Sequence, residues 1–118
     1  MPEKEVKTIE DKQEIDKIIE EKIKGRKLIF SDWYKIGILK KGIPEEKFDE
    51  IFPQFDKIFA IEIEILTSGN IGYELFYKLS NNTSFSIATI PKNNNLLIIH
   101  LIEYKRNLDY RFKKFKKV

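Results

Sequence analysis

The sequence predicts an α+β domain in which N-terminal helices pack on a four-stranded antiparallel sheet, followed by a basic C-terminal tail. Three observations lead to this prediction. Isoleucines recur at near-helical spacing before residue 25, the apolar period changes to two near Phe59, and short polar turns separate the later apolar runs. Short turns favour antiparallel neighbours, because parallel strands need long crossover connections.

The bulk composition suits one folded domain over residues 1–118. A chain of 118 residues can bury a core, and 42% apolar against 35% charged residues is typical of a globular protein. Cysteine is absent, which excludes disulfides and thiolate metal sites, and we expect no metal and no cofactor. The polar start Met1–Glu5 and the shortness of every apolar run predict a cytoplasmic protein without a membrane partner.

Residues 1–25 predict an N-terminal helix. Thr8 is a suitable N-cap, with acidic residues in the turn that follows it. Gly25 can end the helix. The apolar stripe is narrow, which predicts a helix on the surface or against a partner; its members are Ile9, Ile15, Ile18, Ile19 and Ile23.

Residues 31–58 predict a helical region, after a short extended piece at Lys27–Phe30. Ser31 or Asp32 can cap a helix that runs to Lys41 and stops at Gly42. We expect Trp33 and Ile36 to pack inward, with Tyr34 as a further candidate. A second helix restarts at Pro44, because proline fits a first helical turn, and its apolar residues are Phe48, Ile51 and Phe52.

Residues 59–104 predict the antiparallel sheet. Isoleucines alternate with Glu62 and Glu64 in a first strand, and two further alternating runs follow at 71–79 and 85–89. The fourth run, Leu96–Tyr104, is almost continuously apolar, as in a strand covered on both faces. Residues 105–118 form the basic tail.

Two features of the predicted sheet carry candidate chemistry. His100 is the only histidine, and strand alternation places it with Ile98, Ile102 and Tyr104. It is either a general acid or base or a partly buried histidine held by a neighbour. Glu62 and Glu64 share one face, where they act on a substrate, bind a cation or simply form the wet side of the strand.

The basic excess lies at the C-terminus. Residues 103–118 hold seven Lys and Arg against two acidic residues, a net charge of +5, which is more than the +3 of the whole chain. Such a cluster attracts polyanions, or it is a solvated tail that aids solubility, and both interpretations stay open. The candidate nucleic-acid contacts are Lys40, Lys41, Lys113, Lys114, Lys116 and Lys117.

Residue types near the C-terminus suffice for metal-free RNA cleavage. Arg and Lys stabilise charge at a phosphate, and Tyr, His or Lys can transfer protons when their pKa values are perturbed. Aromatic rings can also stack on unpaired bases. The alternative is a basic patch without catalysis. The candidate catalytic residues are His100, Tyr104, Lys105, Arg106, Tyr110 and Arg111.

This order of elements resembles the RelE/ParE-type toxins. In that family an apolar strand runs into His-Arg, with a tyrosine a few residues later; here Tyr104-Lys105 takes the His-Arg position, and Tyr110 stands near the family tyrosine. The segment 33–46 is similar to an uncharacterised RelE-like family through Lys41-Gly42-Ile43 and the acidic pair that follows. Trp33 and Gly37 replace a His and an Arg of that family.

The resemblance implies a toxin of a toxin–antitoxin pair. Its expected activity is that of a metal-free endoribonuclease or translation inhibitor acting on RNA at the ribosome, or a gyrase poison, neutralised by a small antitoxin protein. Two alternatives of other classes stay open: a nucleic-acid-binding domain without catalysis, and a protein-interaction domain, including a homodimer formed through the N-terminal helix or an edge strand. Whether the chain is an enzyme also stays open.

Overall fold

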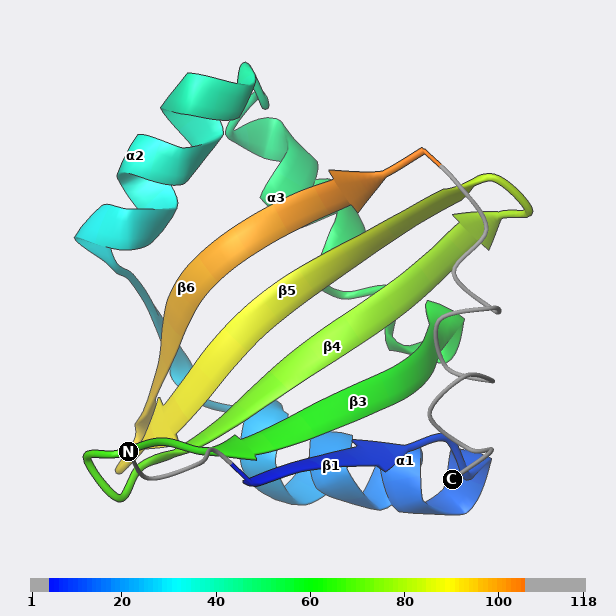
Figure 1. Ribbon diagram of the computed structural model, residues 1–118, viewed down its shortest axis with the longest axis vertical. Helices are drawn as coiled ribbons and strands as arrows, with labels where there is room; N and C mark the ends of the chain where they lie inside the picture. Colours follow the sequence, from blue (N-terminus) through cyan, green and yellow to red (C-terminus); the bar gives the residue numbers. More distant parts are fainter. Residues whose placement is uncertain (1–4, 106–118) are drawn as a thin grey trace.

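A computed structural model describes residues 5–105, which form one curved sheet with helices against one of its faces (Figure 1). The helices are α1 (Lys12–Ile18), continued by a π-helical turn (Ile19–Ile23), α2 (Asp32–Lys41), α3 (Glu46–Ile51) and a 3-10 turn (Phe55–Lys57). The strands are β1 (Glu5–Ile9), β2 (Lys27–Phe30), β3 (Ile58–Ile65), β4 (Ile71–Ser80), β5 (Thr83–Lys92) and β6 (Asn95–Tyr104).

The strand order is β1-β3-β4-β5-β6-β2, so the prediction of a four-stranded antiparallel sheet is wrong. β3 to β6 do pair antiparallel with one another, but they are only the middle of a six-stranded sheet. β1 adds an antiparallel edge beside β3, and β2 adds a parallel edge beside β6. Both additions come from the first 30 residues and pair with strands distant in sequence, which local periodicity does not report.

The predicted N-terminal helix over 1–25 is also wrong at its beginning. Thr8 is not an N-cap, because it lies in β1 opposite Glu62. Asp11 takes that role, and its side chain accepts a hydrogen bond of 3.0 Å from the Glu14 amide. The helix that follows buries every fourth residue against the sheet: Ile15, Ile19 and Ile23.

α2 begins and ends where the sequence predicts, but its inward face differs. The Ser31 hydroxyl caps it by accepting from the Tyr34 amide, and Gly42 ends it at a φ of +67°. Tyr34 and Ile38, one turn apart, are the buried residues. Trp33 and Ile36 are 77% and 49% exposed, so the expectation that they pack inward is wrong.

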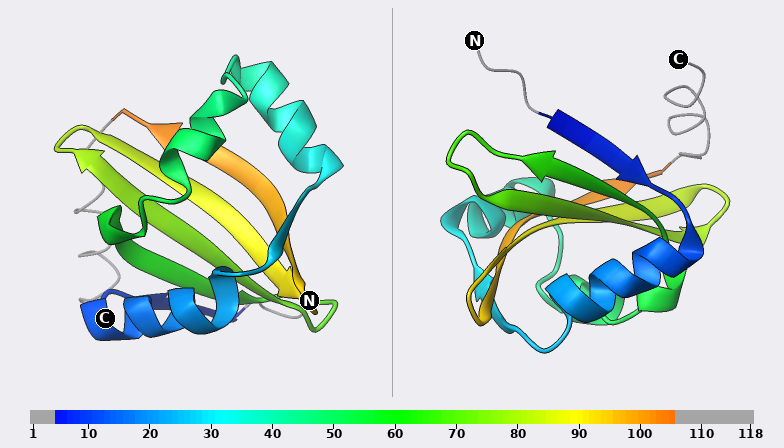
Figure 2. Two further views of the ribbon diagram at one scale, coloured as in Figure 1. Left: turned by 180° about the vertical axis from the view of Figure 1, so that it is seen from behind. Right: turned by 90° about the horizontal axis from the view of Figure 1, so that it is seen from below.

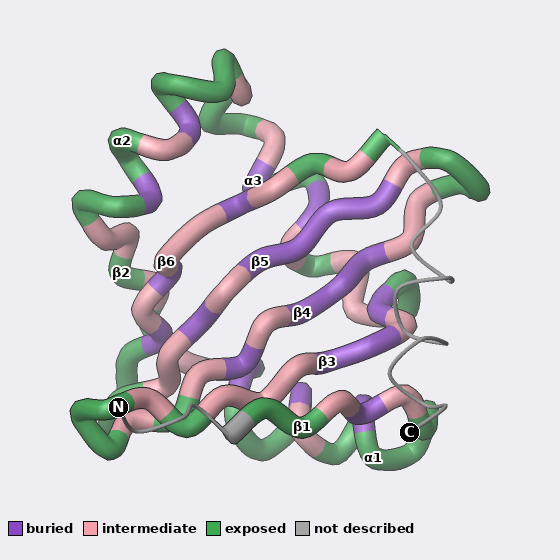
Figure 3. Tube along the Cα trace, in the orientation of Figure 1, coloured by how far each residue is buried: buried purple, intermediate pink, exposed green. Residues whose placement is uncertain are grey.

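The core lies between the inner face of the sheet and the helices of residues 5–105, which Figure 2 shows on one side of the sheet. Its centre is aromatic: the Phe48 ring lies 5.0 Å from Phe30 and 5.0 Å from Phe52, measured between ring centroids. Buried side chains of β4 and β5 complete it: Leu75, Tyr77, Phe85 and Ile87. Figure 3 shows that both strands are buried over several successive residues. Among the described residues, no helix is both long and apolar enough to cross a membrane.

β2 is fixed to the far end of the sheet by backbone and side-chain bonds. The Ser31 amide donates to the Ile98 carbonyl at 3.0 Å, directly after the β2–β6 ladder. The Arg26 guanidinium donates to the Asn93 carbonyl in the β5–β6 turn. These bonds join segments nearly 70 residues apart and hold α2 beside the upper part of β6.

A bulge in β6 changes which side chains share a face. Ala88 pairs with His100 whereas Thr89 pairs with Ile98, so Ile99 is an extra residue in the strand. His100, Ile102 and Tyr104 therefore face away from the helices, while Ile98 faces the core. The predicted grouping of His100 with Ile102 and Tyr104 is confirmed, and its grouping with Ile98 is wrong.

Candidate functional site

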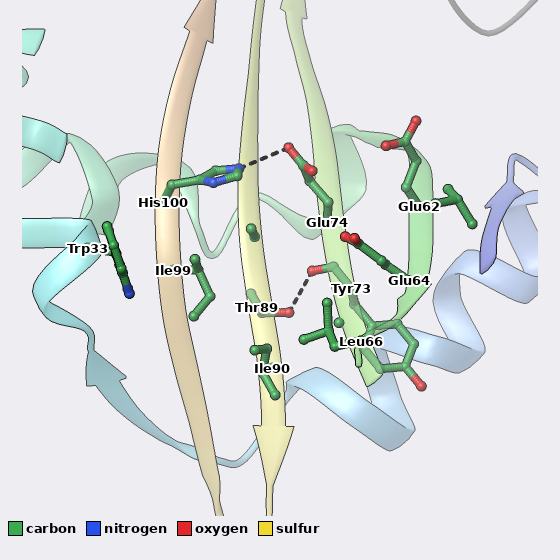
Figure 4. A pocket seen from close by; sticks show the side chains of 13 residues that line it. Trp33, Glu62, Glu64, Leu66, Tyr73, Glu74, Thr89, Ile90, Ile99 and His100 are labelled. Carbon is green, nitrogen blue, oxygen red and sulfur yellow. Dashed lines mark hydrogen bonds and ion pairs between the residues drawn. The ribbon is translucent and has the colours of Figure 1, made fainter. Parts of the chain in front are cut away.

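The sheet face turned away from the helices, which we call the outer face, carries a row of polar side chains. The ladders align Thr8, Glu62, Glu74, Ala88 and His100 across β1, β3, β4, β5 and β6. A hollow of about 380 Å³, here called the outer hollow, lies over this row and the one beside it (Figure 4). The side chains that line this hollow include Glu62, Glu64, Glu74 and His100.

Small residues form the floor of the outer hollow. Gly72 lies beside Glu64 on the neighbouring strand, and Ala88 lies between Glu74 and His100. Strands are about 4.8 Å apart, so the side chains of Glu74 and His100 come from strands nearly 10 Å apart and meet above the short Ala88 side chain. The Glu74 Oε2 atom lies 3.1 Å from His100 Nε2.

The acidic half of the outer hollow lies over β3 and β4. Glu62 stands directly opposite Glu74 in the ladder, with Glu64 two residues along β3. Like charges in direct cross-strand pairs destabilise a sheet. The positive charge of a protonated His100 imidazole would offset the negative charge of Glu74. Lys78 lies further along the same face of β4. The fold therefore concentrates three carboxylates on one part of the outer face.

The opposite half of the outer face is apolar. Ile29, Leu97 and Ile90 align across β2, β6 and β5, and Ile99 follows Leu97 at the bulge. Trp33 of α2 borders the hollow beside Ile99 (Figure 4). At the hollow, the outer face is thus divided between a carboxylate region and a region of aliphatic and indole surface.

The predicted catalytic residues do not converge within the described chain. Tyr104 and His100 share the outer face, but four residues of strand separate them by about 13 Å. The Tyr104 hydroxyl lies 3.2 Å from Ser86 Oγ, and its ring lies 6.3 Å from Phe76. Lys105 is exposed beyond the end of β6. The remaining candidates lie outside the described residues: Arg106, Tyr110, Arg111, Lys113, Lys114, Lys116 and Lys117.

The two predicted nucleic-acid contacts on α2 differ from each other. Lys41 Nζ donates to the Leu101 carbonyl at 3.3 Å, which ties the end of α2 to β6. Lys40 is exposed on the helix surface. Neither lies in the outer hollow, so these lysines and the outer face are separate surfaces.

Two tyrosines that line hollows, Tyr73 and Tyr34, have shifted pKa values, and neither supplies a base. Burial raises the pKa of Tyr73, against a smaller lowering by Arg26. Burial, then the Asp49 and Glu45 carboxylates, raises the pKa of Tyr34. Both phenols therefore stay protonated at neutral pH. Within residues 5–105, no three His, Asp or Glu side chains are arranged to hold a metal ion.

Comparison with known proteins found no relative of this chain. No protein family, no characterised protein and no solved structure matches the chain. The likeness to the RelE/ParE-type toxins accordingly stays a prediction.

Sequence reasoning found part of the outer hollow and missed the rest. Glu62 and Glu64 share a face as predicted, and His100 was singled out. Glu74 was missed, although its alternation with apolar neighbours marks it as facing away from the core. Trp33 was assigned to the core because of its size and apolarity. Only the register shows that Glu74 reaches His100 and that Trp33 borders their hollow.

Proposed function

We propose that this chain is a protein-interaction domain whose outer face binds a basic, amphipathic segment of a partner protein. The observation that carries this proposal is the division of the outer hollow into a carboxylate half and an apolar half. Its two halves match the two faces of such a segment. The proposal takes up the non-enzymatic alternative that the sequence left open.

The carboxylate half suits arginine and lysine. Three glutamates lie within two cross-strand rows, and carboxylates bind guanidinium groups through paired, charge-assisted hydrogen bonds. Glu62 stands directly opposite Glu74, so one guanidinium group can lie within reach of both carboxylates.

The apolar half suits the other side of the same segment. Ile90, Ile99 and the largely exposed Trp33 offer surface that an aliphatic or aromatic side chain would remove from water. Floor residues as small as Gly72 and Ala88 leave room for that side chain. Amphipathic helices use this combination when they lie in a groove.

RNA fits this face less well, because its phosphates would meet the glutamates. The RNA-directed toxin function expected from the resemblance therefore rests on other residues. These are Lys40, Lys41 and the basic residues from Lys105 onward, of which the structure describes only Lys105 beyond the sheet. An RNA arm in the binding experiment separates the two functions.

The test measures binding of a fluorescein-labelled peptide to the full chain by fluorescence anisotropy. The peptide carries leucines at helical spacing on one side and arginines on the other; a second peptide replaces the arginines with glutamates, and a third probe is a single-stranded RNA. We expect the basic peptide to bind with at least tenfold higher affinity than either other probe. Preference for RNA would favour the toxin-type function, and equal binding of both peptides would overturn the proposal.

A matched pair of variants locates the binding. Glu62→Gln with Glu64→Gln removes two charges from the outer face, and we expect at least tenfold weaker binding, equivalent to about 1.4 kcal/mol. Glu21→Gln with Glu46→Gln removes two charges from exposed positions on the helical side, and affinity should change less than twofold. Equal losses in both variants would show that the peptide senses only net charge.

A further inference from the structure

α2 exposes three large apolar side chains that the core does not use. Trp33, Ile36 and Leu39 are 77%, 49% and 81% exposed. Single exposed apolar residues are ordinary, but three on one ten-residue helix form a contiguous patch of the kind found at interaction surfaces. Tyr34 and Ile38 occupy the buried side of the helix, so this patch needs another partner.

Gly37 lies in the same stripe and has no role inside the described chain. Trp33, Ile36, Gly37 and Lys40 follow the spacing i, i+3, i+4, i+7, which lines them up along one side of a helix. A glycine in the middle of a helix is less favourable than alanine. A Cβ at Gly37 would meet nothing within 4 Å, and its φ is not positive. The missing side chain leaves room for close approach by a second helix.

Two charged residues lie symmetrically about Ile36 on the exposed side of α2. Asp32 and Lys40 are exposed and each lies four residues from Ile36. Among residues 5–105, neither takes part in a salt bridge. The exposed side of α2 thus has an acidic residue at one end, a basic residue at the other and an isoleucine midway between them. Two copies of the helix packed antiparallel would therefore place opposite charges together.

We propose that α2 pairs antiparallel with α2 of a second copy of this chain, about a twofold axis at Ile36. In that pairing Ile36 meets its own counterpart, Trp33 stands level with Leu39 of the second copy, and Asp32 stands level with Lys40 of the second copy. Parallel pairing would instead bring like charges level. Ten helical residues span only about 15 Å, so the interface is small and the dimer reversible.

The test uses a pair of charge reversals, which should restore dimer affinity when mixed only if α2 pairs antiparallel. Asp32→Lys places two cations level on each side of the axis, and Lys40→Asp places two carboxylates there. Each variant alone should dimerise at least tenfold more weakly than the wild type in sedimentation velocity. An equimolar mixture of the two variants should regain the affinity, because every level pair in the mixed dimer has opposite charges.

Three controls keep the outcome interpretable. Circular dichroism and thermal melting confirm that each variant is folded. Lys17→Asp makes the same charge change as Lys40→Asp at an exposed position in the last turn of α1, outside α2, and should leave the dimer intact. Ile36→Glu puts two carboxylates at the axis and should abolish it.

Three results would overturn the proposal. A wild type that sediments as a monomer at high micromolar concentration contradicts it directly. A mixture of the two single variants that associates no better than either alone contradicts the antiparallel pairing, and so does an equal loss in Lys17→Asp. Trp33 belongs to both surfaces, but the charge variants at positions 32 and 40 lie outside the outer hollow and the glutamate variants lie outside α2, so the two experiments can fail separately.

Discussion

The two faces of the same sheet differ in what their residues contribute. On β4, Leu75 and Tyr77 are fully buried among the helices, whereas Gly72 and Glu74, at alternate positions of the same strand, border the outer hollow. Inner positions carry large side chains that fill space. Outer positions near the hollow carry a glycine, an alanine and a cross-strand pair of glutamates, which fill little space. The difference indicates that packing determines the inner face and another requirement, which we assign to binding, determines this part of the outer face.

Truncation of the core should have the largest effect on stability. Phe48→Ala empties a site that is 1% exposed and contacts three other aromatic rings, so we expect a loss of about 3–5 kcal/mol in the free energy of unfolding. Ile90→Ala, on the outer face, should cost less than about 1.5 kcal/mol, because that residue is only partly buried. Urea denaturation measures both, and equal losses would contradict the comparison.

Tyr77→Phe should cost about 1–2 kcal/mol at neutral pH. The Tyr77 hydroxyl donates to the Phe52 carbonyl at 2.8 Å, and its loss leaves a poorly solvated carbonyl unpaired.

The same substitution should also flatten the alkaline loss of stability. Burial raises the pKa of Tyr77 above its ordinary value, so above about pH 10 the unfolded chain loses this proton while the folded chain keeps it. The folded state then binds more protons, and stability falls as pH rises. Urea denaturation at about pH 8 and about pH 11 should show a smaller decline in the variant; an identical decline would exclude Tyr77 as a contributor.

Ala88→Leu should separate the two faces in a single variant. The larger side chain enters the outer hollow and stands between Glu74 and His100, so we expect at least a tenfold loss of basic-peptide affinity. The inner face is untouched, and stability should change by about 1 kcal/mol or less. Anisotropy and urea denaturation on one sample test both statements. Unchanged peptide affinity would show that the floor of the hollow does not contact the ligand.

Gly72→Ala should have the smallest effect and the opposite sign. An added Cβ would make only ordinary contacts, the nearest at 3.6 Å from the Thr89 carbonyl oxygen, and alanine loses less chain entropy on folding. We expect a gain of about 0.5 kcal/mol with a measurable loss of peptide affinity. Gly42→Ala is the matched control, because its φ of +67° makes alanine destabilising there. A stability loss at Gly72 would mean that the backbone itself needs this glycine.

The sequence predicted local features well and long-range pairings poorly. Ser31 and Gly42 bound α2 because capping depends on adjacent residues, and the strands between 59 and 104 follow from alternation. The edge strands β1 and β2 were missed as sheet members, because their partners lie tens of residues away. The bulge at Ile99 is hidden in an apolar run where every register looks alike. Hydrophobicity also did not reveal which side of α2 is buried.

The parallel pairing of β2 with β6 also constrains the order of events during folding. Residues 27–30 meet residues 95–98, so the sheet edge beside α2 cannot form until the last described strand is available. Contacts of such large sequence separation slow folding, because the entropy of closing a long loop is lost before any hydrogen bond of the ladder offsets it. On the ribosome, the first half of the chain would have to wait for β6, with Phe30 and Phe48 still exposed to water. A chaperone that recognises exposed aromatic residues would have that interval in which to act.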